Sequence, residues 1–158
     1  MGKKTGPNPT DRAKQGVKRS LLTDAKGIPL GVAVGGANRN DHKLARETLE
    51  NLEADRPASG TERKQNLCVD KGYDYPEVRQ LAEEFHFTLH LRSRGEEAQA
   101  LKRNARTKAR RWVVERTHSW MNRFRGILIR WNKKADNYLS MLHLALGIIS
   151  HRAAGLLG

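Results

Sequence analysis

Two acidic residues stand where they could hold metal ions. Asp70 follows the short apolar run 67–69, which predicts a strand, and Gly72 in the turn after it allows close approach of a ligand. In mixed α/β sheets the loops at the carboxyl ends of strands converge on a crevice, so an acid at this position suits catalysis. The residues alone leave open the alternative that Asp70 only caps the turn with its carboxylate.

Glu115 draws attention through its charge environment. Between Lys102 and Lys134 there are twelve Lys or Arg residues, and Glu115 is the one acidic residue. A carboxylate among so many cations should stay ionised and suits a divalent cation. On a helix, Arg111 lies one turn before Glu115 and His118 one turn after it, so an intrahelical salt bridge between Arg111 and Glu115 is the alternative.

Two acids on separate elements are typical of a two-metal phosphoryl-transfer site, where Mg²⁺ ions activate a nucleophilic oxygen and stabilise the leaving oxygen. Such a site normally contains a third carboxylate. The pair Asp70 and Glu115 therefore predicts this chemistry only together with an acid from elsewhere.

The elements that must position these acids begin with a hairpin. Residues 1–16 contain Gly-Pro-Asn-Pro and predict an irregular lead-in without a strand. The β-prone runs 17–23 and 29–34 flank a turn signal and predict a β-hairpin. A helix is expected over 42–53 with Asp41 as its N-cap. Its apolar stripe comprises Leu44, Thr48, Leu49 and Leu52.

The second half of the chain alternates strands and helices. The expected elements are a strand at 67–69, a helix at 75–85, a strand at 87–91, a helix at 111–125 and a last helix reaching 157. Asp136 or Asn137 is expected to cap the last helix, and 93–110 is basic without a clean apolar face. This order predicts one mixed α/β domain over 1–158, with a sheet that is incomplete.

Composition favours a polyanionic partner. The 30 Lys and Arg against 17 Asp and Glu give a net charge of +13 and a pI near 10.4, which points first to nucleic acid and second to a membrane surface. A single cysteine, Cys68, excludes an intramolecular disulfide and suits the cytoplasm. No secretory signal follows Met1, and polar residues interrupt the apolar stretch 138–157, which indicates a core helix.

Several ordered blocks together resemble the DDE transposases of insertion sequences, in the branch called insertion sequence five. Nearly the whole chain is covered. The two blocks around the candidate acids are Cys-Val-Asp-Lys-Gly-Tyr-Asp at 68–74 and Arg-Trp-Val-Val-Glu-Arg-Thr-His-Ser-Trp at 111–120. The other blocks lie at 6–12, 23–30, 36–42 and 137–139.

The resemblance implies a ribonuclease-H-like mixed sheet with flanking helices, three acids that hold two Mg²⁺ or Mn²⁺ ions, and a reaction that cuts element ends and joins them to target DNA. Asp70 matches the family's second acid and Glu115 its third. Arg111, Arg116 and Arg123 match a region that contacts DNA phosphates. The implied location is the bacterial cytoplasm, in association with the nucleoid.

The chain departs from the family pattern at the first acid, which lies on a strand before the Gly-Pro-Asn-Pro segment. Asp11 and Asp24 come after that point and do not match the motif. We therefore expect a truncated element or a second reading frame, lacking the first central strand and inactive alone. The expected partners are duplex DNA and either further copies of the chain or an upstream transposase segment. The alternative is a nonenzymatic DNA-binding relic or regulator; a protein that binds structured RNA fits less well.

The other reactive or aromatic residues have simpler interpretations. Cys68 on an apolar strand is expected to be a buried small hydrophobe. His86 and His90 lack a zinc-like spacing and are expected to be partly exposed on a strand. The three tryptophans are expected to pack against helices, with stacking on flipped bases as the alternative. They are Trp112, Trp120 and Trp131.

Overall fold

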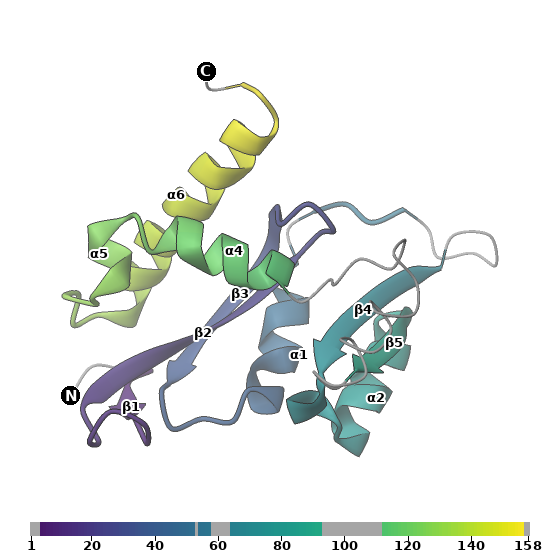
Figure 1. The fold of residues 1–158 in the computed structure, drawn as a ribbon, viewed down its shortest axis with the longest axis horizontal. Coiled ribbons are helices and arrows are strands. Elements are labelled where there is room, and N and C mark those ends of the chain that lie inside the picture. The colour runs from purple at the N-terminus through teal and green to yellow at the C-terminus, as the bar shows by residue number, and fades with distance from the viewer. Residues whose placement is uncertain (1–3, 53, 58–63, 93–111, 157–158) are drawn as a thin grey trace. The chain divides into compact units, whose positions relative to one another are not determined.

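The computed structural model describes residues 4–52, 54–57, 64–92 and 112–156, and Figure 1 shows their elements. Packing divides the chain into two compact units, one of Met1–Leu52 with Val113–Gly158 and one of Glu53–Trp112. The first holds an antiparallel sheet and the second a parallel one. The expected mixed α/β class is confirmed, whereas one catalytic domain over 1–158 stays a prediction.

An antiparallel hairpin organises the first unit. Strand β2 (Gln15–Thr23) pairs with β3 (Pro29–Gly36), so that Val17 lies opposite Gly36. The side chain of Asp24 closes the turn, because its Oδ1 accepts hydrogen bonds from the N–H groups of Lys26 and Ile28, both at 2.8 Å. Gly27 follows at φ 82°, a conformation that glycine adopts without strain. The predicted hairpin is confirmed.

The lead-in contains a short strand, so the expectation that 1–16 has none is wrong. Strand β1 (Gly6–Pro7) pairs antiparallel with the first residues of β2. A local turn makes this possible: the N–H of Asn8 donates to the Lys14 carbonyl at 2.8 Å, and the Asn8 side chain accepts from the N–H of Thr10 at 3.1 Å. Turn residues that indicated irregular structure here serve to reverse the chain.

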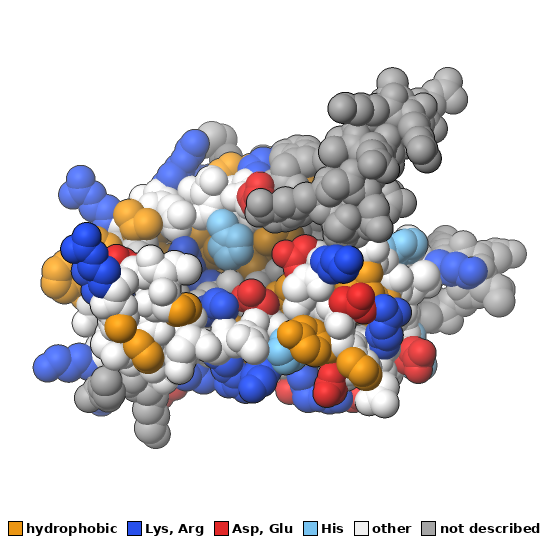
Figure 2. Space-filling view, turned by 60° about the horizontal axis from the view of Figure 1, so that its bottom comes forward, with side chains coloured by type: hydrophobic (Ala, Val, Ile, Leu, Met, Phe, Trp, Pro, Cys, Tyr) orange, Lys and Arg blue, Asp and Glu red, His pale blue; other side chains and the backbone are white. Residues whose placement is uncertain are grey.

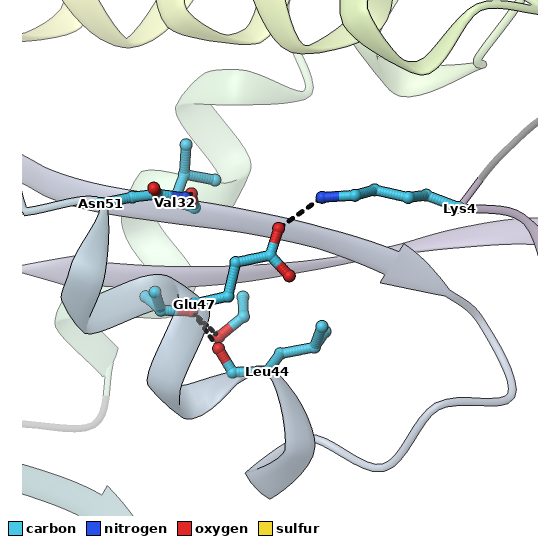
Figure 3. Close-up of polar contacts among 7 residues, drawn as sticks. Lys4, Val32, Leu44, Glu47 and Asn51 are labelled. Atoms are coloured by element: carbon cyan, nitrogen blue, oxygen red, sulfur yellow. Dashed lines mark hydrogen bonds and ion pairs between the residues drawn. The ribbon is translucent and has the colours of Figure 1, made fainter. Parts of the chain in front are cut away.

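Helix α1 (His42–Glu50) covers one face of the hairpin and buries Leu44, Thr48 and Leu49, three of its four predicted stripe residues. Thr48 Oγ1 donates to Ser20 Oγ on β2 at 2.7 Å, and Asn51 Nδ2 donates to the Val32 carbonyl at 3.0 Å. Figure 3 shows Asn51 beside Val32, and Glu47 paired with Lys4. Helix and hairpin are therefore joined by buried polar contacts as well as apolar packing.

Asp41 does not cap helix α1 with its side chain, which corrects the sequence-based expectation. Its carboxylate instead lies 3.2 Å from the ammonium group of Lys18 on β2. The nearby cation offers the carboxylate a charged partner in place of the free amides of the first helical turn.

Three helices cover the opposite face of the hairpin, as Figure 1 shows. They are α4 (Trp112–Met121), α5 (Arg125–Leu128) and α6 (Ala135–Ala153). Their shared core consists of Val32, Val34, Met121, Ile127, Tyr138, Leu142, Ala145, Leu146 and Ile149. Helix α6 begins at Ala135 with Lys134 at the N-cap position and no side-chain cap, so the expected caps Asp136 and Asn137 are wrong.

The second unit is a parallel strand pair with one helix. Strand β4 (Gln65–Asp70) pairs with β5 (Phe87–Arg92), and the 3₁₀ turn η1 (Lys71–Tyr73) and helix α2 (Pro76–Glu84) connect them. Residues Val78, Leu81 and Ala82 of α2 are buried. These elements confirm the predicted strand, helix, strand order. No helix among the described residues is long and apolar enough to cross a membrane.

Candidate functional site

Asp70 ends strand β4 with an exposed side chain. Its Oδ1 accepts a hydrogen bond from the N–H of Gly72 at 3.0 Å, and Asp70 is the N-cap of η1. The capping alternative is therefore observed. It does not use up the carboxylate, because no second hydrogen bond or ion pair joins Asp70 to another described residue. An oxygen remains for an external ligand such as a divalent cation.

Asp70 shares a polar strand face with Asn66 and Cys68, since alternate residues point to the same side. On β5, His90 lies opposite Cys68, and the His90 ring lies 2.7 Å from Asn66 Oδ1. Cys68 is exposed, so its expected burial is wrong: Leu67, its neighbour in β4, occupies the buried side. His90 on β5 is partly exposed, as expected, whereas His86 is exposed and lies in the turn before β5, so its expected place on a strand is wrong.

Glu115 stands on the exposed side of α4. The opposite side of this helix buries Val113, Thr117 and Met121, and Thr117 Oγ1 donates to the Gly27 carbonyl in the hairpin turn at 2.7 Å. This contact fixes the rotation of α4 and hence the direction in which Glu115 projects. Arg111, the proposed salt-bridge partner, lies outside the described residues.

His118 lies one turn after Glu115 and is partly buried. Burial lowers the pKa of His118 below its usual 6.5, the positive charge of Arg19 lowers it further, and Glu115 acts in the opposite direction. The imidazole beside Glu115 is therefore neutral at pH 7.

Asp70 belongs to the second unit and Glu115 to the first. A shared metal site for the two acids stays a prediction. Within the described ranges, no group of three or more His, Cys, Asp or Glu side chains could hold a metal ion. The donor chemistry of the two exposed carboxylates nevertheless fits Mg²⁺ or Mn²⁺, which prefer oxygen ligands.

The basic residues expected to contact DNA have different surroundings. Arg116 donates to the Lys26 carbonyl in the hairpin turn, and its guanidinium lies 4.8 Å from the centre of the Trp120 ring. Arg123 is exposed and pairs with no described residue. Figure 2 shows both basic and acidic side chains at the surface of the described residues. The Arg123 side chain is thus available to a further partner, whereas the Arg116 guanidinium is engaged by the hairpin turn and by Trp120.

Arg19 on β2 is a residue of interest that sequence reasoning missed. Its Nη2 donates to Asn122 Oδ1 at 2.8 Å, while its Nη1 is buried and has no hydrogen-bond partner among the described residues. Burial raises the pKa of nearby Tyr138, and Arg19 acts against that shift. The sequence could have indicated this position, because alternate residues of a strand point to the same face. Arg19 therefore shares its face with Val17 and Leu21, which pack against the core.

Comparison with known proteins gives matches over most of the chain. The family model described as "Transposase DDE domain" matches residues 2–149. A Burkholderia cepacia protein named as a transposase for insertion sequence element IS402 is 37% identical over 155 residues, which cover 92% of this chain and 68% of that protein. No solved structure matches. The chain belongs to the DDE transposase family.

Proposed function

We propose that the chain acts in DNA transposition, by metal-dependent cleavage of DNA and transfer of the cut ends, with Asp70 and Glu115 as two ligands of the metal site. The observation that carries the proposal is the state of Asp70: an exposed acid at the carboxyl end of a parallel strand, with carboxylate oxygen left over after its one bond to Gly72. When bound, Mg²⁺ or Mn²⁺ would supply the Lewis acid that activates the attacking oxygen and stabilises the leaving one.

The protein's own part would be to place acids and cations around the phosphodiester. Asp70 is oriented by the N–H of Gly72, and Glu115 by the seating of α4 on the hairpin turn. Arg123 is available to neutralise a phosphate, and Arg111 is a further candidate. Phosphate contacts carry no base information, so binding to duplex DNA should show little sequence preference and should weaken steeply with salt.

We further propose a ribonuclease-H-like fold completed by a central strand that carries the first acid. What supports this is the state of the strand edges. Strand β2 pairs with β1 only at Gln15 and Gly16 on one edge, and β4 pairs only with β5 among the described strands. Open edges present unpaired N–H and C=O groups and favour an added strand. The chain by itself would then be catalytically incomplete.

The test compares Asp70→Asn and Glu115→Gln with Asp74→Asn, an exposed acid that pairs with Arg79. DNA carrying the element's ends is incubated with Mg²⁺ or Mn²⁺ and with the chain, alone or extended by the upstream segment. We expect nicking only with the extended chain, together with a higher melting temperature, and loss of nicking in the first two variants but not in the third.

Other outcomes are informative. Cleavage by the chain alone that disappears in Asp70→Asn would refute incompleteness while supporting the site. Binding without cleavage by the extended chain would favour the alternative of a nonenzymatic DNA-binding relic or regulator. A salt series on the chain and on Arg123→Ala tests the phosphate contacts separately: a logarithmic slope near zero would exclude phosphate neutralisation as the source of binding.

A further inference from the structure

Trp131 lies in the loop between α5 and α6 and is 79% exposed. Its expected packing against a helix is therefore wrong, whereas Trp120 does pack against the core of the first unit. A tryptophan side chain offers a large apolar surface that is costly to leave in water, and it is enriched where one ring face meets a partner. Its exposure calls for a functional account.

The loop holds Trp131 outward by anchoring both of its neighbours. Arg130 Nε donates to the Asn132 carbonyl at 2.9 Å, and the Arg130 guanidinium lies 5.3 Å from the centre of the Tyr138 ring. Asn132 Nδ2 lies 3.0 Å from Met141 Sδ on α6. Because the residues on both sides are tied to the body of the unit, the backbone at Trp131 is held in place, and less conformational freedom is lost there when the ring meets a ligand.

The charge around this loop selects the kind of ligand. No acidic residue occurs from Arg116 to Ala135, and the next one is exposed Asp136 in the first turn of α6. The side chains of Arg125, Lys133 and Lys134 are exposed, and none of them forms a hydrogen bond or ion pair with another described residue. A protein with an apolar pocket would need an acidic rim to match these cations, whereas a nucleic acid supplies phosphates and flat aromatic bases together.

We propose that Trp131 is a base-stacking residue, whose indole ring stacks on a DNA base that is unpaired or turned out of the duplex. Lys133 and Lys134 neutralise the phosphates on either side of that base. An aromatic side chain cannot stack on a base enclosed in a regular duplex, so the loop discriminates by DNA structure and not by sequence. This inference rests on the proposed function only in taking DNA as the partner; it requires no metal site and no cleavage.

The experiment measures binding of the full chain by fluorescence anisotropy, with a chelator present so that no divalent ion takes part. The three probes are a duplex, the same duplex with one extra unpaired base, and a single strand. The variants are Trp131→Ala and Trp131→Phe, and the matched control is Leu144→Ala, another exposed apolar residue (67%) of the same unit.

We expect Trp131→Ala to weaken binding to the bulged and single-stranded probes by roughly 5- to 100-fold, the range that loss of one stacked base gives. Duplex binding should hardly change, Trp131→Phe should recover most of the affinity, and Leu144→Ala should behave as the unchanged chain. The melting temperature of each variant shows whether it folds.

Four results would overturn the inference. Equal losses on all three probes would make Trp131 a general contact, and no loss on any probe would remove it from the DNA surface. Dissociation of an oligomer by Trp131→Ala, seen by sedimentation, would make the loop a protein interface. If the unchanged chain bound none of the probes, the proposed function would fail as well; if it bound DNA regardless of Trp131, only this inference would fail.

Discussion

The two strand pairs of the molecule differ in how they are covered. Hairpin β2–β3 has α1 on one face and α4 to α6 on the other, and Val32, Ala33 and Val34 in β3 are all buried. In β4, by contrast, Leu67 is buried while its neighbour Cys68 is exposed. In a strand enclosed on both faces, burial of every apolar side chain contributes to stability. In a strand covered on one face, only every second side chain contributes in this way.

This difference bears on the two candidate acids. Glu115 is mounted on a helix that packs onto the enclosed hairpin, and Thr117 bonds that helix to the hairpin turn. Asp70 ends a strand of a two-stranded sheet, an arrangement that is marginal without further packing. The structure therefore predicts that the surroundings of Glu115 resist local unfolding more than those of Asp70.

Truncation of a buried side chain in the core of the first unit should lower stability more than any other change considered. Leu142 is 0% exposed, and Leu142→Ala should lower the free energy of unfolding by about 2–5 kcal/mol. The counterpart in the second unit is Leu81→Ala, at a residue 4% exposed, with a loss toward the lower end of that range. Denaturant unfolding measures both losses.

Native-state hydrogen exchange tests whether the two units unfold separately. Leu142→Ala should speed amide exchange in β2 and β3, and Leu81→Ala should speed it in β4 and β5. Equal acceleration throughout the chain in both variants would contradict separate units and show one cooperative structure.

Close approach of α1 to the hairpin gives the next largest effect. A Cβ on Gly31 would lie 2.7 Å from the Thr48 carbonyl oxygen and 2.9 Å from that of Asn51, and such backbone atoms cannot move aside. Gly31→Ala should therefore cost about 1–3 kcal/mol of stability. Gly147 on α6 meets nothing within 4 Å, so Gly147→Ala should raise stability by up to about 1 kcal/mol through helix propensity. A lower denaturation midpoint for Gly31→Ala and a higher one for Gly147→Ala would confirm both expectations. A lower midpoint for both variants would contradict the second.

The sequence predicted those parts of the fold that depend on local patterns. The β-prone runs on either side of the turn at Asp24 predicted the hairpin, the stripe through Leu44 and Thr48 predicted α1, and the apolar run before Asp70 predicted β4. In each case the pattern along the chain and the packing in space favour the same conformation.

Several of the failures have a different origin, because they depend on residues distant in the chain. Asp41 has the type and position of an N-cap, yet Lys18 on β2 takes its carboxylate. Arg19 contacts Asn122 although 103 positions separate them. Cys68 was expected inside because its strand is apolar, but which strand face is covered depends on the tertiary structure. The preferences of residues for local structure do not predict these long-range contacts.

A smaller effect separates the observed capping role of Asp70 from its proposed catalytic role. Asp70→Ala removes the acceptor for the Gly72 N–H and should cost about 0.5–2 kcal/mol, whereas Asp70→Asn keeps an acceptor and should change stability little. Both variants should abolish cleavage, since an amide is a poor ligand for a site that needs a carboxylate. Thermal unfolding and nicking by the extended chain are measured side by side. An active Asp70→Asn variant would leave Asp70 as a turn cap only.

The weakest of the predicted effects is a pH dependence of stability that originates at His118, beside Glu115. Burial, assisted by Arg19, lowers the folded-state pKa of His118 below 6.5. As the pH falls through 6.5, the unfolded chain takes up a proton at His118 that the folded chain does not, so unfolding becomes more favourable. The contribution of neutral His118 to stability is therefore fully present above that pH and is lost as the pH falls below it.

His118→Gln takes up no proton in either state, so its stability should fall less between about pH 7 and pH 5 than that of the unchanged chain. Urea unfolding at a series of pH values measures the difference between the two curves. Parallel curves would show that His118 is as well solvated in the folded chain as in the unfolded one, and the packing of α4 on the hairpin would then be looser at this point than at Thr117.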